Sequence, residues 1–343
     1  MRLEQTRYSE FGIVRDMLAA VDVIRAFEPA AVEPIVPAVR DAGRLFLTGE
    51  GSSRIFPAKN AIADSRRRGD SLAIDTEAGS QAAEYDLADH AVLGVSNSGR
   101  TAEVIGLFSK LKEANHQRRF SLAAHADSKL ESLATRGFTL SCGPESAVAA
   151  TKSVLEQALF ARALVDAVAG RTLKAAELSR AADQVQAALT AVIDPAITAA
   201  ISQAKTIYWA GRNDGVAEEL TLKTNEITRK SADFLEGTYA VHGVEEVMSA
   251  EDVLIWVDPY PESEAKFQEV LATNVGVRVF AISSRPTLFP TIAIEDAGPL
   301  AGFVQMAAGW NVLVEVGLAL GIDLDKPLRA RKVGNEFTEP GPR

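Results

Sequence analysis

The strongest constraint on the fold of this chain of 343 residues is an internal repeat. An apolar run ending in glycine occurs twice, as RLFLTG at 44–49 and TIYWAG at 206–211, and the two glycines are 162 positions apart. Two more apolar runs follow each copy at nearly the same spacing, AVLGV at 91–95 with VLIWV at 253–257 and SLAAHA at 121–126 with VFAISS at 279–284. Self-similarity of this kind indicates two copies of one structural unit, which diverge in the loops that carry specialised function.

Within each copy, short runs of β-branched and aliphatic residues alternate with stretches of helical periodicity, such as 149–165 and 217–227. This alternation is typical of βαβ units, in which helices cover both faces of a parallel sheet. We therefore predict an α/β fold with two tandem domains, each a doubly wound parallel β-sheet. The first domain is expected at 1–170, including the N-terminal helices, and the second at 171–343, beginning with an Ala-rich linker helix at 171–189.

The charge balance narrows the range of partners. There are 36 Lys and Arg against 46 Asp and Glu, which gives a net charge of −10. Such a chain is poorly suited to nucleic acid or to an anionic membrane surface, so neither partner is expected. An anion that binds here does so at a local site, against the overall field.

Residue types that would indicate other functions are scarce. The single cysteine, Cys142, excludes an internal disulfide and fits a reducing cytoplasm. It is expected to be a core residue, with a nucleophile as the alternative. No CxxC, HxH or HExxH pattern occurs, so neither a metal nor a cofactor is predicted. The polar N-terminal stretch is unlike a signal peptide, and no run of about 18 apolar residues indicates a membrane span.

Two polar loops of the first copy follow predicted strands, GEGSSR at 49–54 and SNSGRT at 96–101. Ligands of open parallel sheets bind at the carboxyl ends of the strands, and hydroxyls with exposed N–H groups at a helix start suit an anion. Capping of the following helices is the alternative for either loop alone. Two such loops on adjacent strands favour a phosphate-like ligand. The matching loop of the second copy, DPYPES at 258–263, has two prolines and two acids and is a poor anion cradle.

The second copy carries different chemistry. Lys223 and Glu226 are spaced i and i+3 on a predicted helix and share a face. His242 lies in a glycine-containing loop. A surface ion pair and a structural histidine are the alternatives, but a Glu and a His near a sugar form a sensible acid–base pair. The C-terminal stretch from Asp323 is either a solvated tail or a source of a Schiff-base lysine.

These segments together resemble the sugar isomerase (SIS) domain family. The resemblance is strongest to the two-domain isomerase half of glucosamine-6-phosphate synthase and its stand-alone relatives, over about residues 35–334. It is carried by five motifs: GSS at 51–53, SNSGRT at 96–101, CGPESAVAATK at 142–152, LKTNEI at 222–227 and DLDKPLRARKV at 323–333.

The resemblance implies two groups of substrate-binding residues. The first two motifs imply an anion site for the sugar phosphate, formed by Ser52, Ser53, Ser96, Asn97, Ser98, Arg100 and Thr101. The motif at 142–152 implies further substrate contacts from Glu145, Val148 and Thr151.

The resemblance also implies the catalytic set. Glu226 is the implied base that moves a proton between C1 and C2, and His242, 16 positions further on, is the implied aid to ring opening. In the family this histidine typically comes from a neighbouring subunit, so a homodimer with a shared active site is expected. Lys332 is the implied Schiff-base partner of the ketose carbonyl, and Lys223 a further active-site lysine.

Some positions depart from the family pattern. Asn97 stands for the usual glutamine, Arg100 for a glutamate, and His242 is followed by Gly-Val rather than Gly-Pro. Nothing resembles the glutaminase half or its N-terminal cysteine nucleophile, so ammonia from glutamine is not expected. The additional arginine raises the hypothesis of a different anion, such as a sulfonate.

The predicted function is therefore a phosphosugar isomerase that interconverts aldose and ketose 6-phosphates through an enediol or enolamine. The alternatives, in order, are a glucosamine-6-phosphate deaminase, a deglycase of sugar–amino acid 6-phosphates, an isomerase of a sulfonated hexose, and a non-catalytic sugar-phosphate sensor. The expected partner is a small sugar phosphate.

Overall fold

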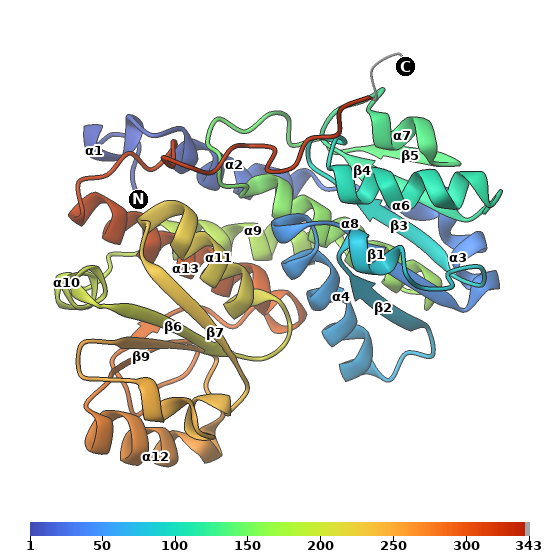
Figure 1. Ribbon diagram of the computed structural model, residues 1–343. Helices are drawn as coiled ribbons and strands as arrows, with labels where there is room; N and C mark the ends of the chain where they lie inside the picture. Colours follow the sequence, from blue (N-terminus) through green and yellow to red (C-terminus); the bar gives the residue numbers. More distant parts are fainter. Residues whose placement is uncertain (340–343) are drawn as a thin grey trace. The chain divides into compact units, whose positions relative to one another are not determined.

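The computed structural model describes residues 1–339, which form two compact units, each built from three segments of chain. The β1–β5 unit comprises 26–144, 152–175 and the C-terminal segment from residue 331. The β6–β10 unit comprises 1–25, 145–151 and 176–330. Each unit contains one five-stranded sheet (Figure 1).

The sheet of the β1–β5 unit is parallel throughout, in the order β2-β1-β3-β4-β5. Its strands are β1 (Arg44–Thr48), β2 (Ala73–Glu77), β3 (Ala91–Val95), β4 (Arg119–Ala123) and β5 (Arg136–Thr139). Every residue of β3 and β4 is buried, because helices cover both faces of a parallel sheet. The apolar runs that mark the repeat are therefore the inner strands.

The sheet of the β6–β10 unit has the same topology. Its strands are β6 (Thr206–Gly211), β7 (Ser231–Glu236), β8 (Val253–Val257), β9 (Arg278–Ser283) and β10 (Thr291–Ala293). They pair in parallel in the order β10-β9-β8-β6-β7, which from the other edge repeats the pattern of the first sheet. The predicted α/β fold of two doubly wound parallel sheets is confirmed.

Helices form two layers in the β1–β5 unit. They are η1 (Pro29–Ile35), α3 (Val36–Ala42), η2 (Gly51–Ser53), α4 (Ile55–Arg68), α5 (Gly79–Ala82), α6 (Ala102–Glu113), α7 (Lys129–Leu133) and α8 (Lys152–Val168). Helices α5, α6 and α7 cover one face through a cluster that includes Phe46, Val92 and Phe108, while α3, α4 and α8 form the other layer (Figure 1). Gly94 of β3 permits this packing, since a Cβ there would lie 2.4 Å from the Phe108 ring.

The β6–β10 unit is also layered. Its helices are α1 (Thr6–Ser9), α2 (Gly12–Ala26), α9 (Ala175–Thr190), α10 (Pro195–Gln203), α11 (Val216–Thr228), η3 (Tyr239–Val241), η4 (Val244–Val247), η5 (Pro261–Ser263), α12 (Glu264–Phe267), the π-helix η6 (Gln268–Val275), η7 (Gly298–Leu300) and α13 (Ala301–Ala319). Helices α11 and α13 pack together on one face, and α12 with η6 covers the other (Figure 1). There the Trp256 ring stacks on Phe267 with ring centroids 3.7 Å apart.

Among residues 1–339, one helical segment reaches the length and composition of a membrane span, Gly298–Ala319, and the bent pair α9–α10 passes the same test as a single span. In Gly298–Ala319, 83% of the most apolar window is buried inside the structure. Gly309 of α13 lies against Leu220 of α11, where a Cβ would be 2.4 Å from a Leu220 methyl group. This segment is therefore the core helix of its unit.

The units do not divide the chain at one point, whereas the predicted domains meet at residue 170. The N-terminal segment joins the β6–β10 unit through specific polar contacts. The Asp325 carboxylate accepts hydrogen bonds from the backbone N–H groups of Gly12 (2.7 Å) and Ile13 (2.8 Å). The Asp16 carboxylate accepts one from the N–H of Ser146 (2.6 Å), which holds 145–151 in the same unit.

A buried ionic network joins α4 to α8 in the β1–β5 unit. The Arg162 guanidinium is fully buried and lies 2.9 Å from the Asp64 carboxylate and 3.3 Å from that of Asp166. Arg68 contacts both carboxylates, at 2.9 and 2.8 Å. Burial raises the pKa of Asp64 in spite of these arginines, which shows how strongly the site disfavours an uncompensated charge.

Arg162→Met is expected to destabilise the chain by about 3–5 kcal/mol, because it removes the fully buried cation from two buried carboxylates and leaves them only the partly exposed Arg68 and Arg171. Arg25→Met is the matched control, since Arg25 and its partner Asp183 have side chains 40% and 66% exposed. Its expected cost is below about 1 kcal/mol. Urea unfolding followed by circular dichroism measures both variants. Equal losses would show that the buried network contributes no more than a surface pair.

Candidate functional site

The first candidate element lies where the order of the β1–β5 sheet reverses. The chain passes from β1 outward to β2 on one side and then to β3 on the other. A crevice forms at the carboxyl ends of strands at such a switch point, and this is where doubly wound folds bind ligands. The two polar loops, 49–54 and 96–101, follow β1 and β3 (Figure 1). The predicted adjacency of these loops is thus observed.

The loop after β3 is tightly ordered. The hydroxyl of Ser96, which is 1% exposed, lies 2.8 Å from that of Thr101. Gly99 has a φ of +64°, and its N–H donates to the Ser96 carbonyl at 3.0 Å. The Asn97 carbonyl accepts a hydrogen bond from the N–H of Ala124, which follows β4. The loop is therefore fixed before any ligand arrives, as an anion site requires.

The loop after β1 is shaped by glycines. A Cβ on Gly49 would lie 2.8 Å from the Val95 carbonyl oxygen, so only glycine lets the ends of β1 and β3 approach this closely. Gly51 has a φ of +51° and begins the 3₁₀ turn that carries the partly buried Ser52 and Ser53. The adjacent Glu50 carboxylate accepts a hydrogen bond from the N–H of Gly79 at 2.8 Å.

The C-terminal segment crosses the start of α6. The N–H of Ala102 donates to the Asn335 carbonyl (3.0 Å), and the N–H of Phe337 donates to the Arg100 carbonyl (2.8 Å). The Arg100 guanidinium pairs with the Glu336 carboxylate at 2.7 Å. Lys332 is exposed and lies three residues before this contact, in the same unit as both polar loops.

The second candidate element is a charge cluster on α11. The Lys223 ammonium lies 2.6 Å from a Glu226 carboxylate oxygen and 3.3 Å from one of Glu219. The side chains of Lys223 and Glu219 are 0% exposed, whereas Glu226 is 21% exposed. The alternative of a surface ion pair is wrong for Lys223, because the helix turns this face into the core.

The electrostatics keep Lys223 charged. Burial is the largest single influence on its pKa and lowers it, but Glu226, Glu219 and Glu145 together raise the pKa above its ordinary value. Lys223 is therefore an ammonium at neutral pH. It donates a hydrogen bond to Glu226 and is not a free amine.

The segment 145–151 lies in the same unit as this cluster. The Glu145 carboxylate accepts hydrogen bonds from the backbone N–H (2.6 Å) and the hydroxyl (3.2 Å) of Thr151. The N–H of Val148 donates to the Asp325 carbonyl at 3.0 Å. The three substrate-contact predictions from this motif thus belong to the β6–β10 unit, although the motif precedes the second copy in sequence.

Sequence reasoning missed Glu219. Its spacing of four residues before Lys223 was a readable signal, since i and i+4 share a helix face as i and i+3 do.

His242 lies at the end of η3, just before Gly243, which has a φ of +106°. Its Nε2 atom is 3.4 Å from the Thr238 hydroxyl. Within residues 1–339, no described hydrogen bond or ion pair links His242 to the α11 cluster. Large apolar side chains flank it, with Tyr239 53% and Val247 75% exposed.

The switch point of the second sheet is occupied by the protein itself. Arg212, after β6, pairs with the Asp258 carboxylate, after β8, at 2.6 Å. The same guanidinium lies 4.3 Å from the centroid of the Tyr260 ring. The carboxylate of Asp258 and the ring of Tyr260 thus already hold the cation of Arg212, and the loop 258–263 offers no free cation of its own to an anion.

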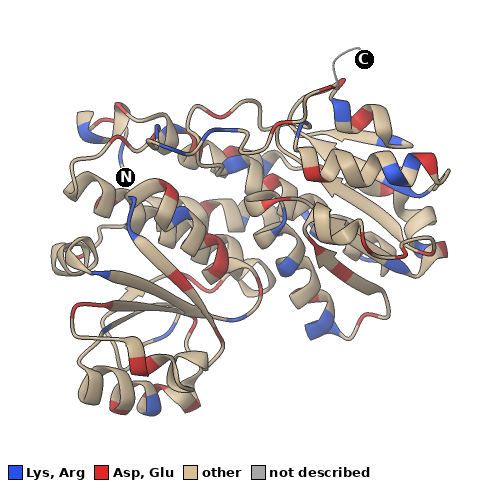
Figure 2. Ribbon diagram, viewed as in Figure 1, with Lys and Arg blue, Asp and Glu red and all other residues tan. Residues whose placement is uncertain are grey.

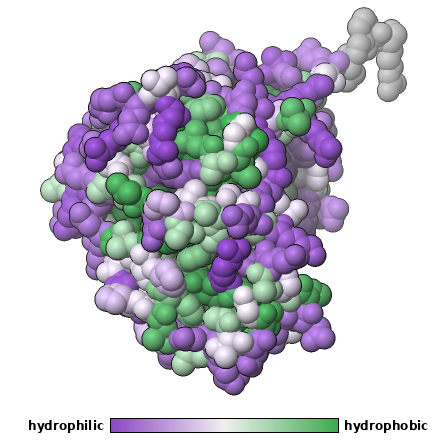
Figure 3. Space-filling model, turned by 90° about the vertical axis from the view of Figure 1, so that its left-hand side faces the viewer, coloured by the Kyte–Doolittle hydropathy of each residue, from purple (hydrophilic) through white to green (hydrophobic). Residues whose placement is uncertain are grey.

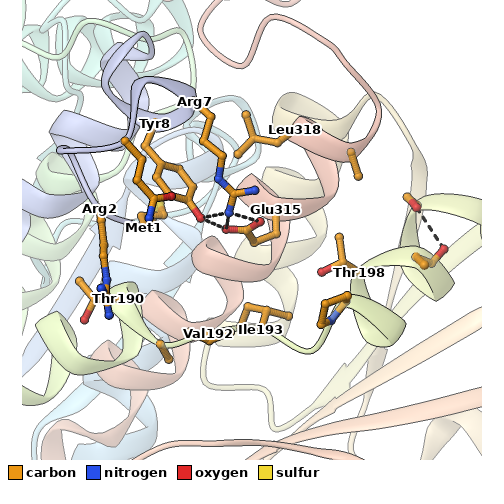
Figure 4. A pocket seen from close by; sticks show the side chains of 16 residues that line it. Met1, Arg2, Arg7, Tyr8, Thr190, Val192, Ile193, Thr198, Glu315 and Leu318 are labelled. Atoms are coloured by element: carbon orange, nitrogen blue, oxygen red, sulfur yellow. Dashed lines mark hydrogen bonds and ion pairs between the residues drawn. The ribbon is translucent and has the colours of Figure 1, made fainter.

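A cavity of about 760 Å³ in the β6–β10 unit is a weaker candidate. In Figure 4, Arg7 and Tyr8 both point to the Glu315 carboxylate, which accepts hydrogen bonds from both. These charged groups already satisfy one another. Val192, also in its lining, is 87% exposed. Figure 3 shows hydrophobic groups among hydrophilic ones on one face of the molecule. None of the predicted site residues lines this cavity.

Residues 1–339 contain no group of three or more His, Cys, Asp or Glu placed to hold a metal.

Comparison with known proteins agrees with this architecture. Residues 65–167 match the family model for the SIS domain, so the predicted resemblance is confirmed and this part of the chain is a SIS domain. No curated protein matches the sequence.

Solved structures share the fold over most of the chain. The tagatose-6-phosphate ketose/aldose isomerase from Escherichia coli is 19% identical, with a TM-score of 0.74 over 96% of this chain and 99% of that one. The glucosamine-6-phosphate deaminase from Thermotoga maritima is 16% identical, with a TM-score of 0.71 over 93% and 99%. The C-terminal domain of a glucosamine-fructose-6-phosphate aminotransferase from Francisella tularensis is 19% identical, with a TM-score of 0.72 over 90% and 98%.

Glu50→Gln should increase the free energy of unfolding at pH 7. Burial raises the pKa of Glu50 in the folded state, so its ionisation costs stability at pH values above that raised pKa. Gln keeps the acceptor for the Gly79 N–H and has no charge to bury. The gain should shrink as the pH falls through the raised pKa and vanish below about 4.5, where the unfolded Glu is also protonated.

Urea unfolding of wild type and variant at pH 7 and pH 4 measures this difference. Glu77→Gln, a partly buried glutamate at the end of β2, is the control and should show a smaller pH-dependent difference. A gain of equal size at both pH values would contradict the assigned cause.

Proposed function

We propose that this chain is an enzyme that acts on a small phosphorylated sugar, and that its reaction is aldose–ketose isomerisation by proton transfer between C1 and C2. The observation that carries the proposal is the cluster on α11. Lys223 and Glu219 are fully buried, and Glu226 alone of the three is partly exposed. A base must reach its substrate, and a charged neighbour must hold it in place; Glu226 and Lys223 meet these two requirements.

The roles of the other residues follow from the same chemistry. The hydroxyls of Ser53, Ser96, Ser98 and Thr101 and the amide of Asn97 hold the phosphate without adding fixed charge. Binding of this remote group positions the reacting carbons for proton transfer. Glu226 takes the proton from one carbon and returns it to the next, and His242 assists opening of the ring. Lys332 polarises or binds the carbonyl, since its side chain is exposed and a lysine amine can form an imine with a ketose.

Deamination of an amino sugar phosphate is the second candidate. It uses the same base and yields a ketose phosphate and ammonia. The fold shared with the Thermotoga maritima glucosamine-6-phosphate deaminase supports testing it alongside isomerisation. Incubation with glucosamine 6-phosphate, with ammonia and fructose 6-phosphate measured in one tube, separates the two: equal amounts of both products indicate a deaminase. Deglycation of sugar–amino acid conjugates ranks third, since it has no evident need for Lys332.

Glu226→Gln should lower kcat by about 10²–10⁴-fold, because it removes the group that carries the proton. Exchange of the C2 proton in D₂O, followed by NMR over a panel of hexose and hexosamine 6-phosphates, gives the rate. Glu218→Gln makes the same change on the same helix and should leave the rate within a factor of two. If no sugar is turned over by the wild type while binding survives in Glu226→Gln, the chain is a sensor and the proposal fails.

A homodimer with a shared active site is part of the proposal. The exposed Tyr239 and Val247 beside His242 support it, since apolar side chains grouped on a loop favour a protein contact. Mixing inactive Glu226→Gln with inactive His242→Asn should restore part of the activity if the two residues act across subunits. No recovery would place both residues of one site in a single chain.

Arg100→Glu should change the preference among anions. Arg100 adds a cation at the start of α6, and its guanidinium is 59% exposed even with Glu336 bound, so it remains accessible to a ligand. The ratio of affinities for hexose 6-phosphates and 6-sulfonates measures the effect. Lys110→Glu, the same change of charge in the last turn of α6, is the control. An unchanged ratio in Arg100→Glu would remove the arginine from anion selection.

A further inference from the structure

The C-terminal segment pairs through its backbone with the end of the loop after β3. The N–H of Ala102 donates a hydrogen bond to the Asn335 carbonyl at 3.0 Å. The N–H of Phe337 donates one to the Arg100 carbonyl at 2.8 Å. Glu336 lies between these two bonds, so its backbone is held on both sides beside the loop that carries the proposed anion site.

Side chains hold the same segment at further points. The Asn335 amide donates to the Glu103 carboxylate at 2.8 Å, and the Phe337 ring packs against the core cluster under α6 and α7. The Lys129 ammonium lies 2.9 Å from the Glu339 carboxylate and 5.4 Å from the centroid of the Phe337 ring. Figure 2 shows acidic residues of the C-terminal segment beside basic residues of the α6–α7 region. Loss of a single ion pair therefore leaves the segment attached.

The side chain of Glu336 is directed at a cation of the proposed anion site. Its carboxylate lies 2.7 Å from the Nε atom of Arg100, and the two side chains are 46% and 59% exposed. Arg100 and Ser98 both line a cavity of about 790 Å³ in the β1–β5 unit, which leaves room for a ligand at this loop. An anion that reaches Arg100 thus meets a cation that already has a carboxylate partner.

This carboxylate can be displaced from Arg100, but Glu336 cannot leave the loop. The backbone bonds on both sides keep its side chain within roughly 6 Å of an anion bound to the guanidinium. The repulsion between the two grows with the charge of the ligand. At this separation in water, each unit of ligand charge weakens binding about threefold. A dianion is therefore penalised more than a monoanion of the same shape.

We propose that Glu336 is a specificity-determining residue of the anion site, which lowers its preference for dianionic phosphates so that it also accepts monoanionic sugar 6-sulfonates. Arg100 alone would favour the dianion, because attraction to a cation also grows with charge. The pinned carboxylate offsets this advantage. The inference rests on the proposed function in one respect, that the loop 96–101 binds the anionic group of the substrate.

Two small anions test the proposal without any sugar and without turnover. Methyl phosphate and methanesulfonate are similar in size, and at pH 8 the first carries two charges and the second one, since a phosphate ester loses its second proton near pH 6. The thermal unfolding midpoint, measured against anion concentration at constant ionic strength, gives both affinities. Glu336→Gln should bind methyl phosphate about tenfold and methanesulfonate about threefold more tightly than the wild type, so that the phosphate-to-sulfonate ratio rises about threefold.

Two further variants separate charge from attachment of the segment. Glu339→Gln makes the same change three residues further on and breaks the ion pair with Lys129, and it should leave the ratio unchanged. Glu336→Asp keeps the carboxylate and should retain a ratio near that of the wild type. Hydrogen exchange of the Ala102 and Phe337 amides should be as slow in Glu336→Gln as in the wild type, because their carbonyl partners are intact.

Equal tightening of both anions in Glu336→Gln would make Glu336 a simple competitor and overturn the proposal, as would an unchanged ratio. The same rise in Glu339→Gln would assign the effect to a loosened segment and overturn it too. If neither anion binds the wild type or Glu336→Gln, the anion site itself is refuted and the proposal falls with it. A threefold rise confined to Glu336→Gln supports the proposal even where no sugar is isomerised, and isomerase activity with an unchanged ratio refutes it alone.

Discussion

The parallel pairing of β1 between β2 and β3 is the constraint on which the rest of the β1–β5 unit depends. Helices cover both faces of such a sheet, so its inner strands are apolar and polar chemistry is confined to the strand ends. The same pairing recurs with β6 between β7 and β8. The two copies then diverge at the same point: one crevice is lined with hydroxyls, whereas the other is filled by the pair of Arg212 and Asp258. Two copies of one fold thus carry different side chains at the same point of the sheet, hydroxyls in one copy and an internal ion pair in the other.

The burial of Lys223 is a second constraint on the structure, because its ammonium needs carboxylates around it. An ammonium that is 0% exposed is costly unless carboxylates surround it, and one helix supplies only Glu219 and Glu226. The third influence, Glu145, comes from a segment far away in sequence that packs into the same unit. The backbone contacts of Asp16 and Asp325 hold the neighbouring segments in place. This explains in physical terms why the compact units are discontinuous along the chain.

The inner strands of both sheets were within reach of the sequence, because apolar runs and their spacing are local signals, whereas the edge strands and the strand order were not predicted. The α11 pair of Lys223 and Glu226 was readable for the same reason. The assignment of 1–25 and 145–151 to the β6–β10 unit could not be predicted from the sequence. It depends on a few hydrogen bonds to the carboxylates of Asp16 and Asp325, and such contacts produce no periodic pattern in the sequence. Glu219 was missed because it lies outside the quoted motif 222–227, although its partner Lys223 lies within it. The contact of Glu336 with Arg100 joins residues 236 positions apart, and no local sequence pattern in either segment predicts it.

If an acidic chain binds an anion, local contacts must offset the repulsion between that anion and the net negative charge of the protein. With a net charge of −10, every additional bound phosphate works against the whole molecule. The loop 96–101 meets this with hydroxyls and backbone N–H groups, which attract an anion without a fixed charge that would need a partner in its absence. Arg100 of the same loop and Lys129 at the start of α7 are fixed cations, and the chain neutralises them with its own carboxylates, Glu336 and Glu339. The first arrangement favours a permanent substrate site, because it costs little when empty. At the second arrangement an incoming anion must first displace a carboxylate of the chain, so that only the difference between the two anions contributes to its binding.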